Sequence, residues 1–235
     1  MICKNLKYKS QPFPQEGQLA DRANLSLGPL RQALVSDGGW GYRYIVATIK
    51  NKKGSFIQEG CAPNFQGGLI TLCTCKHKMR TYKSSTDWSG VWIAGFSSVR
   101  AGGGRQALVY LMKVERAFDS HYDFWFSDLM METKQSKAAN IHPLGDVYQP
   151  RSRNIDKYNL KDYLPPYKNH VHGHDNNWHN DIVYHRYGRP SSLLVGNPDL
   201  SFLWNKPMLY SPPPIQAQGE KKYDLKELLN QLRED

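Results

Sequence analysis

Hydrophobic positions in the middle of the chain follow the two-residue period of β-strands. Residues 42–49 alternate apolar and polar side chains, and residues 107–114 (ALVYLMKV) form a nearly continuous apolar run. The first pattern is typical of a half-buried strand and the second of a central strand buried on both faces. Further strands are predicted at 56–57, 69–75, 92–96, 192–195 and 202–204, with a turn at 51–54.

Two segments change to the period of a helix. Residues 119–133 begin with a capping residue, Asp119 or Ser120, and predict an amphipathic helix packed on the sheet. Its apolar face consists of Tyr122, Trp125, Phe126, Leu129 and Met130. Residues 223–232 predict a terminal helix that docks on the body of the protein or on a second copy of the chain, as a homo-oligomer. Its stripe consists of Leu225, Leu228, Leu229 and Leu232.

Short strands, one main helix and long loops predict an α+β fold. The expected architecture is a curved, mostly antiparallel sheet or small β-barrel with one main packed helix. Three regions are predicted along the chain: an extended N-terminal arm at 1–40 with the option of a short helix near 30–35, the α+β domain at 41–210, and a Pro-rich linker with the amphipathic helix at 211–235.

The net charge of +10 narrows the classes of partner. An excess of 31 Lys and Arg over 21 Asp and Glu predicts contact with DNA or a nucleotide, with solubility alone as the alternative. Four cysteines in 235 residues do not make a disulfide scaffold, and neither a signal peptide nor a membrane-spanning run is evident. We therefore expect a cytoplasmic protein without a membrane partner.

The most informative segment joins a glycine-containing loop to a cluster of cations. Residues 62–68 (APNFQGG) lead into the strand predicted at 69–75, and Lys76, Lys78 and Arg80 follow it. If the strand continues, these three cations share one face and predict an anion cradle, or else a solvated strand end. Arg100 and Arg105 flank a Gly102–Gly104 loop and extend the same predicted binding patch.

Six motifs occur in an order that resembles the second family of nucleotide-modification-associated domains. They are A-P-N at 62–64, T-L-C-T-C-K at 71–76 with Arg80, W-I-A-G-F-S-S at 92–98, L-V-Y-L-M-K-V at 108–114, Y-D-F-W at 122–125 and G-D-V-Y at 145–148. The resemblance covers roughly residues 42–207. The resemblance implies that the protein takes part in the hypermodification of DNA bases. Departures from the family pattern are Cys73, His77, Ser89–Val91 and Phe96.

Asn64, Trp92, Ser97 and Ser98 are candidates for a pocket that holds a base. An Asn side chain pairs with a base edge through its donor and acceptor, and a Trp ring stacks on an extruded base. The alternatives are a core position for Trp92 and a strand-to-loop turn at Ser97 and Ser98.

Candidate catalytic residues, besides Asn64, lie in two places. Cys75 is a candidate nucleophile whose thiol Lys76 and His77 would activate, with a buried structural thiol as the alternative. The histidine-rich segment 170–185 supplies His179 and Asp181 as acid–base candidates, together with Tyr184 and His185, unless it is a polar surface loop.

Metal and cofactor signals are weak. Cys73, Cys75 and His77 would share a strand face, but a ligand spacing of two is atypical for zinc, so no metal site is predicted. Neither a phosphate-binding loop nor a dinucleotide fingerprint occurs, and the cofactor stays unknown.

Three functions follow as hypotheses. The first is an enzyme, or a component of an enzyme system, that acts on a nucleotide or a DNA base. The second is a non-catalytic module that binds nucleic acid or a modified base. The third is an oligomeric scaffold built through the terminal helix. The sequence leaves the reaction and the identity of the base open.

Overall fold

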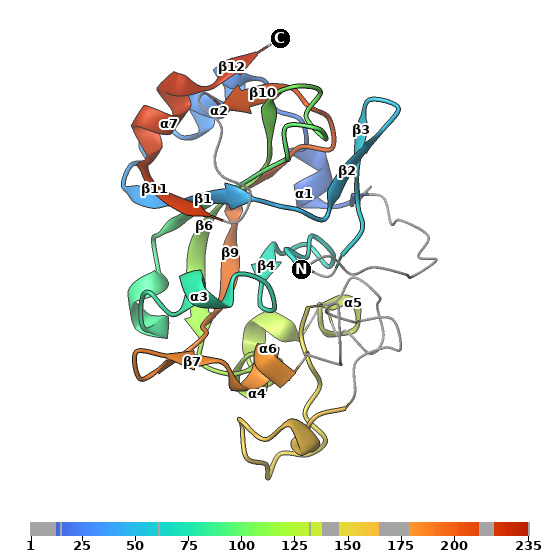
Figure 1. Cartoon of the computed structure of the whole chain (residues 1–235), viewed down its shortest axis with the longest axis vertical. Coiled ribbons are helices and arrows are strands. Elements are labelled where there is room, and N and C mark those ends of the chain that lie inside the picture. Colours follow the sequence, from blue (N-terminus) through green and yellow to red (C-terminus); the bar gives the residue numbers. More distant parts are fainter. Residues whose placement is uncertain are drawn as a thin grey trace. The chain divides into compact units, whose positions relative to one another are not determined.

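The computed structural model describes residues 13–14, 16–60, 62–131, 133–137, 146–164, 179–211 and 219–234, with the side chains of Gln135, Ser136 and His179 outside that description. The chain forms two compact units (Figure 1). Within the described ranges, unit 1 consists of residues 60–89 and 115–196, and unit 2 of residues 13–59, 90–114 and 197–234. Each unit is therefore assembled from segments far apart in the sequence.

Unit 2 is built on a curled, mostly antiparallel sheet, which confirms the predicted α+β class. Its strand order is β11-β1-β5-β6-β10-β12, and β9 also pairs with β6. The pair β1–β5 is parallel, whereas β1–β11, β5–β6, β6–β10 and β10–β12 are antiparallel. The strands are β1 (Trp40–Ile45), β5 (Trp92–Phe96), β6 (Gln106–Phe118), β9 (Leu193–Leu203), β10 (Leu209–Ser211), β11 (Glu220–Asp224) and β12 (Arg233–Glu234).

The turn predicted at 51–54 is confirmed as the tip of a separate hairpin in unit 2. Strands β2 (Ile49–Lys52) and β3 (Ser55–Gln58) are joined by Lys53 and Gly54, both with positive φ. Two such residues in succession match the twist of the flanking strands. The Asn51 side chain accepts a hydrogen bond from the Gly54 amide at 3.0 Å and closes the turn.

The helices in the described part of unit 2 are α1 (Gln18–Asp21), α2 (Leu27–Ala33) and α7 (Leu225–Gln231), and α2 and α7 contribute leucines to the core of the sheet. The described part of the predicted N-terminal arm is thus partly helical, and Leu30 is fully buried. The four leucines of the predicted terminal stripe are at most 6% exposed and join the core around Trp92 and Trp204. This stripe docks on its own unit, so a contact between two copies through it would first have to displace α7.

Gly95 on β5 is required by the packing of unit 2. A Cβ at this position would lie 2.1 Å from Cε1 of Tyr110 and 2.7 Å from Cγ2 of Val46. The Tyr110 ring is fully buried, and its hydroxyl lies 2.8 Å from that of Tyr44, which leaves the ring little room to move.

We expect Gly95→Ala to lower the free energy of unfolding by about 1–3 kcal/mol, the usual cost of overpacking a core. The matched control is Gly28→Ala in α2, where a Cβ would meet nothing within 4 Å. There the same substitution should change the free energy of unfolding by less than about 1 kcal/mol, because the helix preference of alanine is opposed by the crowding of a Cβ that precedes Pro29. Urea denaturation of both variants measures the difference, and equal effects would contradict the packing argument.

Unit 1 has little sheet and many short turns of helix. Strand β4 (Thr71–Leu72) pairs antiparallel with the beginning of β9, and β7 (His185–Arg186) forms a hairpin with β8 (Arg189–Pro190). Among the described residues of this unit, two apolar clusters stabilise the fold, one around Phe124 and Trp125 and one around Tyr148 and Tyr163. The helices are α3 (His77–Arg80), α4 (His121–Trp125), α5 (Lys134–Lys137) and α6 (His179–Val183), with 3-10 turns η1 (Ser85–Trp88), η2 (Asp128–Met130) and η3 (Leu160–Asp162).

The helix predicted at 119–133 is broken in the structure. Ser120 caps α4 as predicted, since its hydroxyl accepts a hydrogen bond from the Asp123 amide at 3.1 Å. The helix ends at Trp125 because Ser127 donates its hydroxyl to the Phe124 carbonyl and takes up an extended backbone. The predicted bounds of this helix are therefore wrong, because α4 and η2 together contribute Phe124, Trp125 and Met130 to the apolar cluster.

Candidate functional site

The loop that follows A-P-N in unit 1 is closed by a buried lysine. Lys137 is fully buried and donates to the backbone and side-chain oxygens of Asn64, at 2.9 and 2.7 Å, and to the Leu69 carbonyl. Asn64 also pairs through its backbone with Thr71, so the two ends of the loop meet. All three protons of the ammonium are thereby used by carbonyl oxygens, which fixes the loop.

Asp146 supplies the negative charge of the same buried network. Its carboxylate accepts a hydrogen bond from the Thr71 hydroxyl at 2.8 Å and another from the Cys73 amide at 3.0 Å. Burial raises the pKa of Asp146, while the Lys137 ammonium and these hydrogen bonds lower it. Burial also lowers the pKa of Lys137 to about 7, against the opposing charge of Asp146. This network holds β4 and its loop, and it assigns Asn64 a structural position in the interior.

Arg80 lies inside unit 1 and does not face an external anion. Its guanidinium donates to the carbonyls of Cys75, Ser191 and Ser192 at 2.8, 2.9 and 2.6 Å. Burial lowers the pKa of this side chain, and the surrounding Cys73 and Asp181 raise it. Arg80 thus ties α3 to the segment that enters β9.

The predicted cradle of Lys76, Lys78 and Arg80 is consequently wrong in its geometry. The chain forms the helix α3 at His77–Arg80 and no strand, so alternate residues do not share a face. Lys76 precedes the helix with φ 60°, Lys78 is exposed and Arg80 is fully buried. The strand predicted at 69–75 is shortened to β4 because the residues after it turn into α3.

An imidazole and a carboxylate meet at the centre of unit 1. Nε2 of His77, on α3, lies 2.6 Å from Oδ1 of Asp181, on α6. The other carboxylate oxygen accepts a hydrogen bond from the Tyr148 hydroxyl at 2.7 Å. The Asp181 side chain is fully buried, whereas 26% of the His77 side chain is exposed. We call these three residues, His77, Asp181 and Tyr148, the acid–base cluster.

The neighbours of the acid–base cluster fix its orientation. Nδ1 of His121 accepts a hydrogen bond from the Tyr148 amide at 3.2 Å, which leaves its Nε2 to donate to the Asp181 carbonyl at 3.2 Å. His121 therefore links the backbones of two members of the cluster. The Tyr184 ring stacks on His77 at a centroid distance of 5.2 Å. Ile182, next to Asp181, packs with Tyr148 in an apolar cluster that anchors α6.

The structure brings together some of the predicted catalytic residues. Asp181 is a member of the acid–base cluster, and Cys75 lies half-buried two residues before His77. His185 is exposed, and its Nδ1 lies 2.9 Å from the Val183 carbonyl, outside the cluster. The His179 side chain and residues 165–178 lie outside the described residues.

The residues missed as functional candidates are Tyr148, His121, Lys137 and Asp146. Tyr148 and Asp146 belong to the G-D-V-Y motif at 145–148, which was the available signal. Nothing in the sequence marks Lys137 as a buried residue, because a lysine in a polar stretch is ordinarily exposed.

The predicted base pocket is not formed as expected in unit 2. Trp92 is fully buried in the core and donates through Nε1 to the Gly38 carbonyl at 3.2 Å. Ser97 is fully buried, and its hydroxyl accepts from the Ala107 amide. Arg105 places its guanidinium 3.8 Å from the centre of the Tyr210 ring. Ser98 is half-buried and Arg100 exposed, and both line a surface pocket.

No set of three His, Cys, Asp or Glu side chains converges as a metal site in the part of the chain that the structure describes. Within that part, no helix is both long and apolar enough to cross a membrane.

A family model, nucleotide modification associated domain 2, matches residues 42–186. The chain belongs to this family. All members of the acid–base cluster lie within the match, as do Lys137 and Asp146, so the nucleotide modification associated domain 2 contains the site in full. The segment from residue 187 onward, with α7, lies outside it. No curated protein and no solved structure matches the chain.

Proposed function

We propose that this protein modifies a nucleotide or a DNA base by a reaction that requires proton transfer at the acid–base cluster. The observation that carries the proposal is the 2.6 Å contact between a partly exposed imidazole, His77, and a fully buried carboxylate, Asp181. A buried carboxylate that orients a histidine is the usual arrangement of a general acid–base pair. Membership in a family associated with nucleotide modification supports a nucleotide or a DNA base as the substrate.

The contact between His77 and Asp181 supports a division of roles within the cluster. With Nε2–H of His77 donating to Asp181, the lone pair of the neutral ring lies on Nδ1. His77 exchanges a proton with the reacting group, and Asp181 stabilises the imidazolium that forms. Tyr148 donates to the second oxygen of Asp181 and keeps the carboxylate from rotating.

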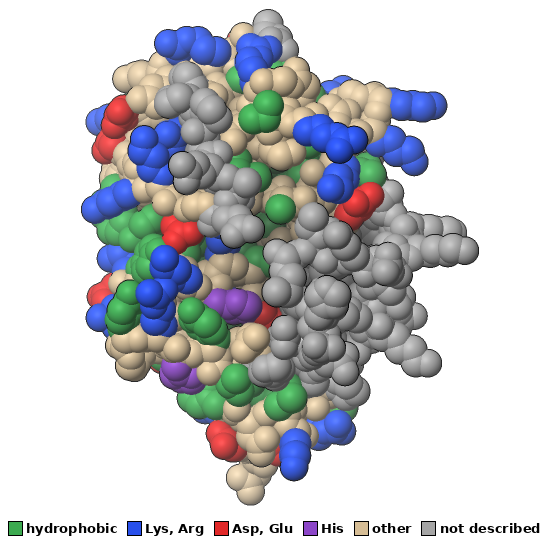
Figure 2. Space-filling model, viewed as in Figure 1, with side chains coloured by type: hydrophobic (Ala, Val, Ile, Leu, Met, Phe, Trp, Pro, Cys, Tyr) green, Lys and Arg blue, Asp and Glu red, His purple; other side chains and the backbone are tan. Residues whose placement is uncertain are grey.

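Non-catalytic recognition of nucleic acid is the competing function, and the net charge of +10 favours it. On the face seen in Figure 2, however, the described Lys and Arg side chains are scattered and do not merge into one basic surface. The net charge of the chain therefore does not identify a surface that binds DNA.

The test compares nucleosides from cells that express the protein, the His77→Gln variant or the His185→Gln control. DNA and the nucleotide pool are digested and analysed by mass spectrometry. We expect a nucleoside of altered mass with the unchanged protein and with His185→Gln, and its loss with His77→Gln. If the unchanged protein yields no altered nucleoside but binds DNA with a steep salt dependence, the binding function replaces the proposal.

A further inference from the structure

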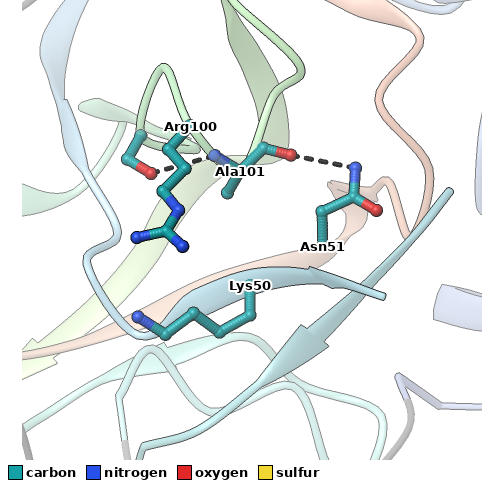
Figure 3. A pocket seen from close by; sticks show the side chains of 5 residues that line it. Lys50, Asn51, Arg100 and Ala101 are labelled. Atoms are coloured by element: carbon teal, nitrogen blue, oxygen red, sulfur yellow. Dashed lines mark hydrogen bonds between the residues drawn. The ribbon is translucent and has the colours of Figure 1, made fainter. Parts of the chain in front are cut away.

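A pocket on the surface of unit 2 is lined, among the residues that the structure describes, by two cations and no acid. Its volume is about 310 Å³, and the lining residues are Lys50, Asn51, Ser98, Arg100 and Ala101. Lys50 comes from β2, whereas the other cation comes from the loop between β5 and β6. In Figure 3 the charged ends of Lys50 and Arg100 face the same space. Such a pocket has the size and the charge to hold part of an anionic ligand.

The loop that presents Arg100 is held by its own hydrogen bonds. The Ala101 amide donates to the Ser98 hydroxyl at 3.2 Å, and the Gly104 amide donates to the Val99 carbonyl at 2.9 Å. A Cβ at Gly102 would lie 1.9 Å from the Arg105 carbonyl oxygen, so only glycine fits this tight turn. The binding geometry is therefore largely formed in advance.

A further hydrogen bond connects this loop to the hairpin that carries Lys50. Nδ2 of Asn51 donates to the Ala101 carbonyl at 3.0 Å, as drawn in Figure 3. The bond sets the spacing between β2 and the loop, so the two cations are held on opposite walls of one pocket.

The charges in the pocket are not neutralised by the protein. Among the described residues, neither Lys50 nor Arg100 has an ion-pair partner. Two like charges on one pocket repel each other, and a bound anion removes that repulsion. The planar guanidinium offers two parallel N–H donors to an oxyanion and the ammonium a point charge, which together suit a tetrahedral phosphate.

We propose that this pocket binds the phosphate group of a nucleotide unit, held by Arg100 and Lys50 with the Ser98 hydroxyl as a further donor. The anion site stands on the geometry and charge of the pocket. The assignment of the phosphate to a nucleotide rests on the proposed function. Phosphate of a free mononucleotide and phosphate of a DNA strand have the same local chemistry, and the experiment separates them.

The experiment follows backbone amide NMR signals of residues 98–104 during titration with inorganic phosphate. The unchanged protein should show saturable shifts, and Lys50→Gln and Arg100→Gln should each weaken binding about tenfold. Lys221→Gln on β11 removes an exposed cation of the same unit away from the pocket and should bind as the unchanged protein does. Thermal unfolding checks that all variants are folded. Shifts that are absent, or equal in all four proteins, overturn the anion site.

Titration with deoxyadenosine, its 5′-monophosphate and a short oligodeoxynucleotide tests the nucleotide assignment. Binding of the monophosphate that is tighter than binding of both the nucleoside and inorganic phosphate, and that is lost in Arg100→Gln, supports a free nucleotide. A gain over inorganic phosphate that is confined to the oligodeoxynucleotide supports a strand. Phosphate binding without any gain for either overturns the nucleotide assignment. These readouts do not involve the acid–base cluster, so an anion site found in a protein that makes no altered nucleoside would contradict the proposed function alone.

Discussion

Asp181→Asn is expected to slow the nucleotide-modifying reaction by about 10²–10⁴-fold while the protein stays folded. The amide has the size of the carboxylate and still offers an oxygen to the Tyr148 hydroxyl. It carries no charge, so it does not stabilise the imidazolium of His77. If its NH₂ faces the ring, Nε2 becomes the acceptor and the ring proton moves to Nδ1, so the tautomer that the carboxylate sets is lost.

The measurement is the yield of altered nucleoside per unit time from equal amounts of folded protein. Asp156→Asn is the control, because this exposed carboxylate of unit 1 accepts a hydrogen bond from the Tyr158 amide at 3.0 Å that the asparagine oxygen retains. The control should keep the full rate. An Asp181→Asn protein with an unchanged rate would rule out acid–base catalysis by the cluster.

Local patterns predict the strands of unit 2 well. Residues 92–96 form β5 with the predicted bounds, and the run at 107–114 lies within β6, buried on both faces over most of its length. The cap at Ser120 and the turn at Lys53–Gly54 are also correct. These features depend on side chains within a few residues of each other, whose chemistry a single sequence displays.

The candidate site depends on contacts that a single sequence does not display. His77 and Asp181 are 104 residues apart, and Lys137 lies 73 residues from Asn64. The strand predicted to run through residues 69–80 is wrong because the helix α3 begins at His77. The helix turns the Arg80 side chain inward and places His77 beside Asp181. Strand β9 similarly joins two predicted strands across Gly196–Asn197, since its pairing with β4 and β6 outweighs the local turn preference.

Lys137→Met is expected to lower the free energy of unfolding by about 3–5 kcal/mol, the cost of removing one partner from a buried charged network. Methionine fills a similar volume but leaves the oxygens of Asn64 and Leu69 without their donor. It also removes the cation that offsets the buried charge of Asp146. The measurement belongs at pH 6, where a lysine whose pKa is about 7 carries its charge.

Two comparisons show whether this loss comes from the network. Lys134→Met changes the same residue type in the same helix, where the ammonium lies 5.1 Å from the centre of the Trp125 ring, and should cost at most about 1 kcal/mol. Asp146→Asn should lower the free energy of unfolding less in the Lys137→Met background than in the unchanged protein. In that background the buried carboxylate has already lost its cation, and the neutral amide removes the cost of the uncompensated charge. If the losses of unfolding free energy from the two single substitutions add up in the double variant, Lys137 and Asp146 stabilise unit 1 independently. The loop after Asn64 would then be held by the hydrogen bonds of Lys137 and not by its charge.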